Sequence, residues 1–150
     1  MKSYVYTYKL PFTLEQFNIG CNYAHAQSVK SYNKATEQPI IAIESQKIED
    51  RKITTVTNYN LRNYPSKMVQ KLIPENCDMI HEVTISLFPW NEHRYTVPKR
   101  PDALTAVLST HIEEQRVMPA DFAAFNPKER YADLCGDGYD GPVIYAYKMF

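Results

Sequence analysis

Short runs in which apolar and polar residues alternate dominate the chain and predict β-strands. Between Ser3 and Leu10, the side chains of Tyr4, Tyr6 and Tyr8 share one face with Leu10. A period of two is the pattern of an extended strand, so the sequence predicts a strand over these residues.

A helix is predicted directly after this strand. Thr13 can cap the helix N-terminus, and Gln16 completes a capping box three residues later. A stripe of small and apolar side chains follows at helical spacing, and we expect it to pack on a sheet: Leu14, Phe17, Cys21, Ala24 and Ser28. We expect the helix to run to about Tyr32, with Gly20 allowing a close approach of the helix to the sheet or to a lipid.

Further strands follow along the rest of the chain, with few helices between them. Strands are expected at Pro39–Ile43, Ile53–Leu61, Met79–Phe88, Arg94–Val97, Leu104–Ile112 and Val143–Phe150, the first two forming a hairpin. A short helix is expected at Pro65–Leu72, a weakly helical segment at Ala120–Tyr131 and a loop at Gly136–Gly141. This order predicts one α+β domain over residues 1–150, with a curved, mainly antiparallel sheet packed with helices.

Composition and charge narrow the function classes. Apolar residues make up 44% of the 150 residues, which is typical of a globular domain. The 17 basic and 17 acidic residues cancel, whereas a nucleic-acid-binding protein normally has a basic excess. We find no apolar run long enough to span a membrane, no secretory signal and no cysteine pattern of a disulfide framework. The sequence therefore predicts a soluble cytoplasmic protein that does not bind nucleic acid.

No set of residues suited to catalysis or to metal binding is visible. The four histidines are scattered, and the neighbours His81 and Glu82 point to opposite faces of a strand. Nucleophile elbows, glycine-rich phosphate loops and dinucleotide fingerprints are not found. We therefore expect no enzymatic activity, no cofactor and no metal.

The strand Met79–Phe88 suggests a binding pocket. One face is apolar apart from His81, and the other sets Glu82, Thr84 and Ser86 between Ile80 and Phe88. Hydroxyl groups among apolar residues suit a pocket that holds both an acyl chain and a polar head group. The alternative is that these polar residues face water on a sheet that is covered on one side only.

Three segments resemble the phosphatidylinositol transfer protein family. They are Tyr8–Gly20, the run Val69–Glu75 followed by Ile80-His81-Glu82 and Phe88-Pro89, and Tyr145-Ala146-Tyr147-Lys148. Together they cover most of residues 4–97 and 143–149. The resemblance implies a START-like, helix-grip lipid-binding fold. It also implies that the protein binds phosphatidylinositol or phosphatidylcholine in an internal cavity and transfers it between membranes without covalent chemistry.

The resemblance also implies the residues that hold the lipid head group. By alignment the family's head-group residues fall on Thr55, Thr57, Ser86 and Lys148. Glu82, which shares a face with Ser86, joins this candidate set. Thr57 replaces a lysine and Ser86 an asparagine, and loss of a charged donor costs about 1.5–3 kcal/mol. We therefore expect weakened selectivity for inositol lipids.

Two departures from the family shape the remaining expectations. Residues 98–142 are shorter than the matching region, and the sequence ends at Phe150, before the strand, loop and covering helix of other members. Because an uncovered apolar cavity is unfavourable in water, we expect a homodimer that covers the open cavity, or a shallow pocket.

Membrane contact is expected at Phe88 and Trp90, since indole rings favour the membrane interface. The alternative for Trp90 is that it caps the core at the sheet edge. We expect association with membranes to be peripheral and transient. The alternative function is a non-transferring interaction or regulatory domain with a degenerate pocket.

Overall fold

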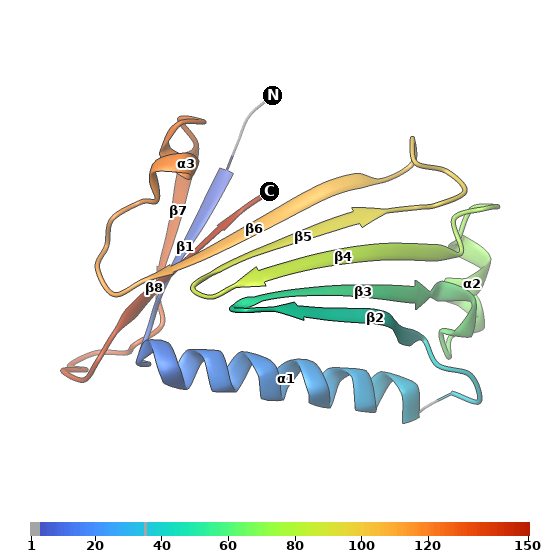
Figure 1. The fold of residues 1–150 in the computed structure, drawn as a ribbon, viewed down its shortest axis with the longest axis horizontal. Helices are drawn as coiled ribbons and strands as arrows, with labels where there is room; N and C mark the ends of the chain where they lie inside the picture. Colours follow the sequence, from blue (N-terminus) through green and yellow to red (C-terminus); the bar gives the residue numbers. More distant parts are fainter. Residues whose placement is uncertain (1–3, 35) are drawn as a thin grey trace.

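A computed structural model describes residues 4–34 and 36–150, in which a large open sheet is accompanied by few helices (Figure 1). The strands are β1 (Tyr4–Leu10), β2 (Ile41–Glu49), β3 (Lys52–Asn60), β4 (Met79–Leu87), β5 (Trp90–Thr96), β6 (Thr105–Glu113), β7 (Lys128–Asp133) and β8 (Ile144–Met149). The helices are α1 (Leu14–Lys34), the 3-10 helix η1 (Leu61–Asn63), α2 (Lys67–Leu72) and α3 (Ala120–Ala123). The predicted α+β class is confirmed, and Ser3 of the first predicted strand lies outside the described residues.

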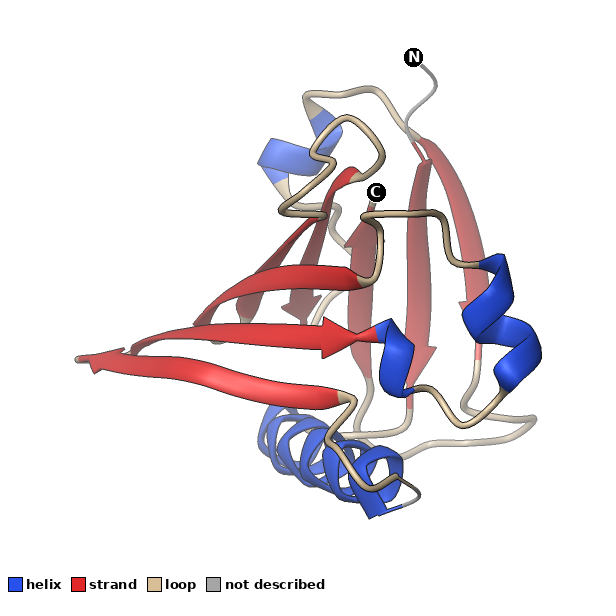
Figure 2. Ribbon diagram, turned by 90° about the vertical axis from the view of Figure 1, so that its right-hand side faces the viewer, coloured by secondary structure: helices blue, strands red, loops and turns tan. Residues whose placement is uncertain are grey.

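The sheet has the strand order β2-β3-β4-β5-β6-β8-β1-β7. Strands β2 to β6 are joined in sequence as antiparallel hairpins. β8 inserts between β6 and β1, and the one parallel pair among the described strands joins β1 to β7. β1, β7 and β8 run steeply across the direction of β2 to β6 (Figures 1 and 2), so the sheet is strongly twisted. The prediction of a mainly antiparallel sheet is therefore confirmed.

One predicted segment is wrong. Ala120–Tyr131 was expected to be weakly helical, but only Ala120–Ala123 is helix and Lys128–Asp133 forms the edge strand β7. β7 has charged residues on both faces, so it carries no apolar alternation that marks a strand. Its extended conformation follows from pairing with β1, more than a hundred positions away in the sequence, which local patterns do not report. The predicted loop at Gly136–Gly141 is confirmed.

Two small clusters of buried side chains form the core, one on each face of the sheet. On one face Val5, Phe122 and Tyr147 pack together beneath α3. On the other face Ile112, Ile144 and Ala146 contact the start of α1 through partly buried neighbours that include Leu14 and Phe17. Both clusters lie at β1 and β8, and the second also includes Ile112 of β6, so the part of the sheet formed by β2 to β4 has little core of its own.

Helix α1 is fixed at its two ends. At its start the predicted capping box is confirmed, because the Gln16 N–H donates to Oγ1 of Thr13 at 3.1 Å and Oε1 of Gln16 accepts from the Thr13 N–H at 2.9 Å. At its other end the Asn33 amide binds the β2 edge: Nδ2 donates to the Ile41 carbonyl at 2.7 Å, and Oδ1 accepts from the N–H groups of Ile40 and Ile41, both at 3.0 Å.

The body of α1 does not pack as the sequence predicted. No described residue of the helix is buried. Leu14 and Phe17 reach the core, but the rest of the expected stripe, including Cys21, is exposed. A Cβ atom added at Gly20 would meet no atom within 4 Å, so the expected close approach of the helix to the sheet at this position is wrong. The helix therefore runs from the core to the β2 edge (Figure 1), and all of its residues between Phe17 and Asn33 except Val29 are exposed.

We predict that the Asn33 amide accounts for a measurable part of the stability of the fold. Asn33→Ala removes three hydrogen bonds and is expected to lower the free energy of unfolding by about 1–3 kcal/mol in a urea titration. Asn22→Ala, in the exposed middle of the same helix, is the matched control and should change it by about 0.5 kcal/mol or less. Equal effects of the two substitutions would show that the hydrogen bonds of the Asn33 amide do not contribute to the stability of the fold.

Candidate functional site

All five candidate head-group residues lie on one side of the sheet. We call this side, against which Leu14 and Phe17 pack, the α1 face, and the opposite side the α3 face. In one cross-strand row Thr57 pairs with Glu82 and Glu82 with Tyr95. In a second row Ser86, Asn91, Thr110 and Lys148 are successive partners. Thr55 pairs with Thr84 between these two rows.

Glu82 is the centre of a hydrogen-bonded cluster on this face. Its side chain is 5% exposed, Oε1 lies 2.8 Å from Nδ1 of His93, and Oε2 accepts a very short hydrogen bond from the Tyr59 hydroxyl. Nδ1 of His93 also lies 3.2 Å from Oγ1 of Thr84, and the His93 ring stacks on Tyr95 with 6.3 Å between centroids. Strands β3, β4 and β5 are thus tied together by one buried carboxylate.

The cluster keeps Glu82 ionised. Burial alone would raise the pKa of Glu82, but hydrogen bonds from His93, Tyr59 and Tyr95 outweigh burial and lower the pKa to about 2. The same contacts act in the opposite direction on the phenols: burial and the hydrogen bond to Glu82 raise the pKa of Tyr59 and of Tyr95. The ionised Glu82 carboxylate therefore gives the α1 face a buried negative charge at strands β3, β4 and β5.

The other candidate polar groups are also partly engaged within the protein. Thr57 is 1% exposed, and the Ser86 hydroxyl donates a very short hydrogen bond to Oδ1 of Asn91. Oγ1 of Thr55 accepts from Nε2 of Gln46 at 3.3 Å. The contacts of Ser86 and Thr55 orient these two side chains before any ligand arrives, and the Ser86 hydroxyl donor is already used.

Lys148 stands apart from this cluster. It makes no ion pair within the described residues, and its neighbours across the strands are Tyr6 and Thr110. Desolvation raises the pKa of the Cys21 thiol on α1, and the Lys148 ammonium partly opposes this rise.

Phe88 and Trp90, the candidate membrane residues, have different surroundings. Phe88 lies in the exposed β4–β5 turn, where the Phe88–Pro89 peptide bond is cis. Trp90 is half-buried and lines a cleft of about 390 Å³ with Phe122 and Phe125 on the α3 face. Of the two, Phe88 has the greater access to a membrane.

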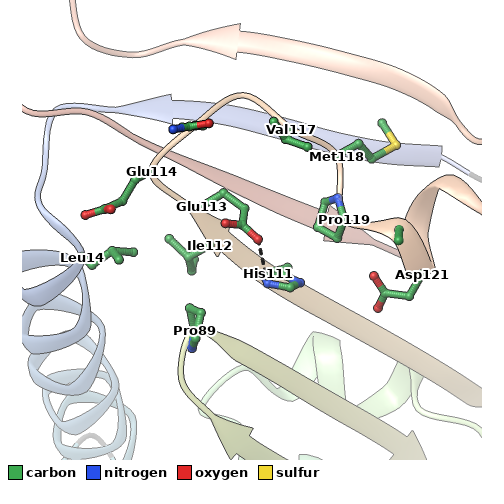
Figure 3. Close-up of a pocket in the computed structure, with 12 residues that line it drawn as sticks. Leu14, Pro89, His111, Ile112, Glu113, Glu114, Val117, Met118, Pro119 and Asp121 are labelled. Atoms are coloured by element: carbon green, nitrogen blue, oxygen red, sulfur yellow. Dashed lines mark ion pairs between the residues drawn. The ribbon is translucent and has the colours of Figure 1, made fainter.

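A second cleft, of about 670 Å³, lies where the segment between β6 and α3 passes the start of α1 (Figure 3). Leu14, Ile112 and Met118 form part of its wall, and Nε2 of His111 lies 3.0 Å from Oε1 of Glu113. None of the five candidate head-group residues lines it. This cleft is therefore separate from the α1-face cluster.

The sequence analysis missed Tyr59, Asn91, His93 and Tyr95, which complete the α1-face polar groups. The alternation of residues along each strand shows which side chains share a face of that strand. It does not show which faces of different strands lie on the same side of the sheet, because that depends on the register. Among the described residues no group of three or more potential ligands forms a metal site. No helix in the described ranges is long and apolar enough to cross a membrane.

Comparison with known proteins gives one family. A family model described as phosphatidylinositol transfer protein matches residues 1–133 of the chain. A search of curated proteins finds no match. The matched range contains every strand that carries the Glu82 cluster, whereas Lys148 lies beyond it.

We predict that the Glu82 cluster makes stability depend on acid pH. Because the pKa of Glu82 is about 2 in the folded protein and near 4.5 when unfolded, its contribution is complete above pH 4.5 and is lost as the pH falls toward 2. Glu82→Gln should lower the free energy of unfolding by about 2–3 kcal/mol at pH 7 and by much less at pH 2.5. Urea titrations across this range measure the difference.

The matched control is Glu49→Gln, which removes an exposed carboxylate paired with Lys47 and should change stability by about 1 kcal/mol or less at every pH. A deficit in Glu82→Gln that is the same at pH 7 and pH 2.5 would contradict the role of the ionised carboxylate.

Proposed function

Since the chain belongs to the phosphatidylinositol transfer protein family, we propose that it binds one phospholipid on the α1 face and transfers it between membranes. The lipid is phosphatidylinositol or phosphatidylcholine. The family is one of lipid transfer proteins rather than enzymes, and the proposed activity is reversible binding without covalent chemistry. We take residues 1–150 as one domain of the START-like, helix-grip type.

The observation that carries this proposal is exposed apolar surface on the α1 face of β2. Ile43 and Ile48 on this face are 51% and 65% exposed, although helix α1 runs past it. Covering such side chains is favourable by about 25 cal/mol per Å² of apolar surface. Acyl chains of a lipid supply that cover, and polar groups on the same face supply partners for its head group.

The proposed head-group residues divide into two roles. Lys148 is half-buried and contacts the head-group phosphate, whereas Thr55 and Ser86, also half-buried but three to four strands away, offer hydroxyls to other polar groups of the lipid. Thr57 and Glu82 are buried and already hydrogen-bonded or packed, so they hold the site in shape. With threonine at position 57 in place of a cation, the contacts that favour an inositol ring over other head groups are few.

Membrane contact is proposed at Phe88 and Trp90. Phe88 is 38% exposed in a turn whose neighbour Leu87 is 45% exposed, which gives an apolar tip for brief insertion. The formal net charge of zero favours transient, peripheral association over firm electrostatic adhesion. The proposed location is the cytoplasm, and a homodimer would cover the open apolar surface between rounds of transfer.

We predict that phospholipid co-purifies with the protein and that the α1 face is needed for transfer. Mass spectrometry of organic extracts should detect phospholipid at about one molecule per chain, and transfer of a fluorescent phospholipid between vesicles should exceed the protein-free rate. Ile43→Glu places a charge on the α1 face and should lower the transfer rate about tenfold or more.

Val107→Glu is the matched control, since Val107 is 45% exposed on β6 and lies on the α3 face, opposite the proposed site. It should transfer lipid at the rate of the unmodified protein. Extracts free of phospholipid, together with a transfer rate equal to the protein-free rate, would instead favour a non-transferring interaction domain with a degenerate pocket.

A further inference from the structure

Three cations gather on the α1 face at the corner formed by β7, β1 and β8. Tyr6 of β1 lies between Arg130 of β7 and Lys148 of β8 in the strand register. One step along the same face, Tyr4 pairs with Lys128. Side chains of alternate residues share a face, so Lys128, Arg130 and Lys148 lie on the same side of the sheet. We call this surface the cationic corner.

Positive and negative side chains alternate along β7, so they lie on opposite faces of the sheet. Glu129 falls on the α3 face, where its carboxylate lies 3.3 Å from the guanidinium of Arg116. Its neighbours Lys128 and Arg130 fall on the α1 face, and neither they nor Lys148 form an ion pair within the described residues. No carboxylate of β7, β1 or β8 lies on this face of the described sheet. A chain without net charge thus has a local excess of positive charge here.

The corner also contains a cleft. Tyr4, Tyr6, Tyr8 and Phe150 line a volume of about 430 Å³. The Arg130 guanidinium lies 5.2 Å from the centroid of the Tyr4 ring and 5.7 Å from that of Tyr6, which holds it at the edge of the cleft. Phe150 meets Tyr6 edge to face at 5.8 Å. The tyrosine hydroxyls add neutral donors to the cations.

This combination suits a phosphate attached to an apolar body. A guanidinium binds two phosphate oxygens at once, and a lysine ammonium adds a second positive charge from the other side. The aromatic rings offer apolar surface to the glycerol and upper acyl groups. The part of the α1 face formed by β3 to β5 is unsuitable for phosphate. Glu82 keeps a buried negative charge there, which is already hydrogen-bonded to His93 and Tyr59.

We propose that the cationic corner binds the phosphate of an anionic phospholipid, with Arg130 and Lys148 on opposite sides of Tyr6. This inference rests on the proposed function and adds to it a phosphate-binding residue, Arg130, and an order of preference. Affinity rises with the negative charge of the head group, so a phosphomonoester lipid binds more tightly than a zwitterionic choline lipid. Lys128 strengthens the field without touching the phosphate.

Isothermal titration calorimetry with short-chain lipids tests the assignment on the full chain. The probes are dihexanoyl phosphatidate, dihexanoyl phosphatidylcholine and inorganic phosphate, each below its aggregation limit. Arg130→Gln should weaken phosphatidate binding about tenfold and change phosphatidylcholine binding by about twofold or less. Arg130→Lys, which keeps the charge, should recover part of the loss. Added NaCl should weaken phosphatidate binding more in the unmodified protein than in Arg130→Gln.

Arg51→Gln is the matched control, because Arg51 is an exposed arginine in the β2–β3 turn with no ion pair in the described residues. It should leave both lipid affinities unchanged. If Arg130→Gln binds phosphatidate as tightly as the unmodified protein, or loses affinity equally for both lipids, the cationic corner is not the phosphate site although lipid binding itself stands.

Two other outcomes separate this inference from the proposed function. If inorganic phosphate binds with the same dependence on Arg130 while neither lipid binds, the corner is a site for free phosphate, and the lipid assignment is overturned. If none of the probes binds to the unmodified protein, both the corner and the proposed lipid binding are overturned.

Discussion

Helix α1 is fixed at its two ends, and this constraint determines how much of the sheet's apolar surface stays accessible to a ligand. The capping box and the contacts of Leu14 and Phe17 hold its start against β6 and β8, and the Asn33 amide holds its end against β2. Between these points the helix buries none of its described residues. A helix that packed along its whole length would cover the apolar side chains of the α1 face. Here they remain accessible to a ligand.

The strands beneath this exposed surface are held together by hydrogen bonds, and charge is distributed unevenly along them. The Glu82 carboxylate joins β3, β4 and β5 through hydrogen bonds from side chains on its neighbouring strands. A buried polar network that is satisfied internally fixes strand positions but leaves few free groups for a ligand. The unpaired cations lie at the other end of the face, around Tyr6. A lipid that spans the face would therefore meet fixed polar groups at one end and positive charge at the other.

Much of the fold could be predicted from local patterns, because hairpins and helix caps are encoded by neighbouring residues. The capping box at Thr13 and Gln16 and the hairpin of β2 with β3 are of this kind. β7 could not be predicted, since it is extended only because it pairs with the distant strand β1. The open middle of α1 was missed because helical spacing does not say whether a sheet lies within reach.

The residues of the candidate site also divide into those that local patterns indicate and those that only distant strand pairing reveals. Period two placed Glu82 and Ser86 on one face of their strand, and the family resemblance added Thr55, Thr57 and Lys148, which the register places on that same face. Tyr59, His93 and Tyr95 became visible only once strand pairing was known, and the roles of all these residues in lipid binding stay predictions. Arg130 also depends on pairing, since Tyr6 brings it next to Lys148.

The central claim is that lipid occupies the α1 face, and isoleucine methyl NMR of the full chain tests it most directly. Ile43, Ile53 and Ile80 lie on the α1 face and Ile85 on the opposite side of β4, which provides an internal reference. On titration with a short-chain phospholipid, the account predicts shifts in the methyl signals of the first three and an unchanged Ile85 signal. A titration that moves Ile85 while Ile43, Ile53 and Ile80 stay fixed would contradict it.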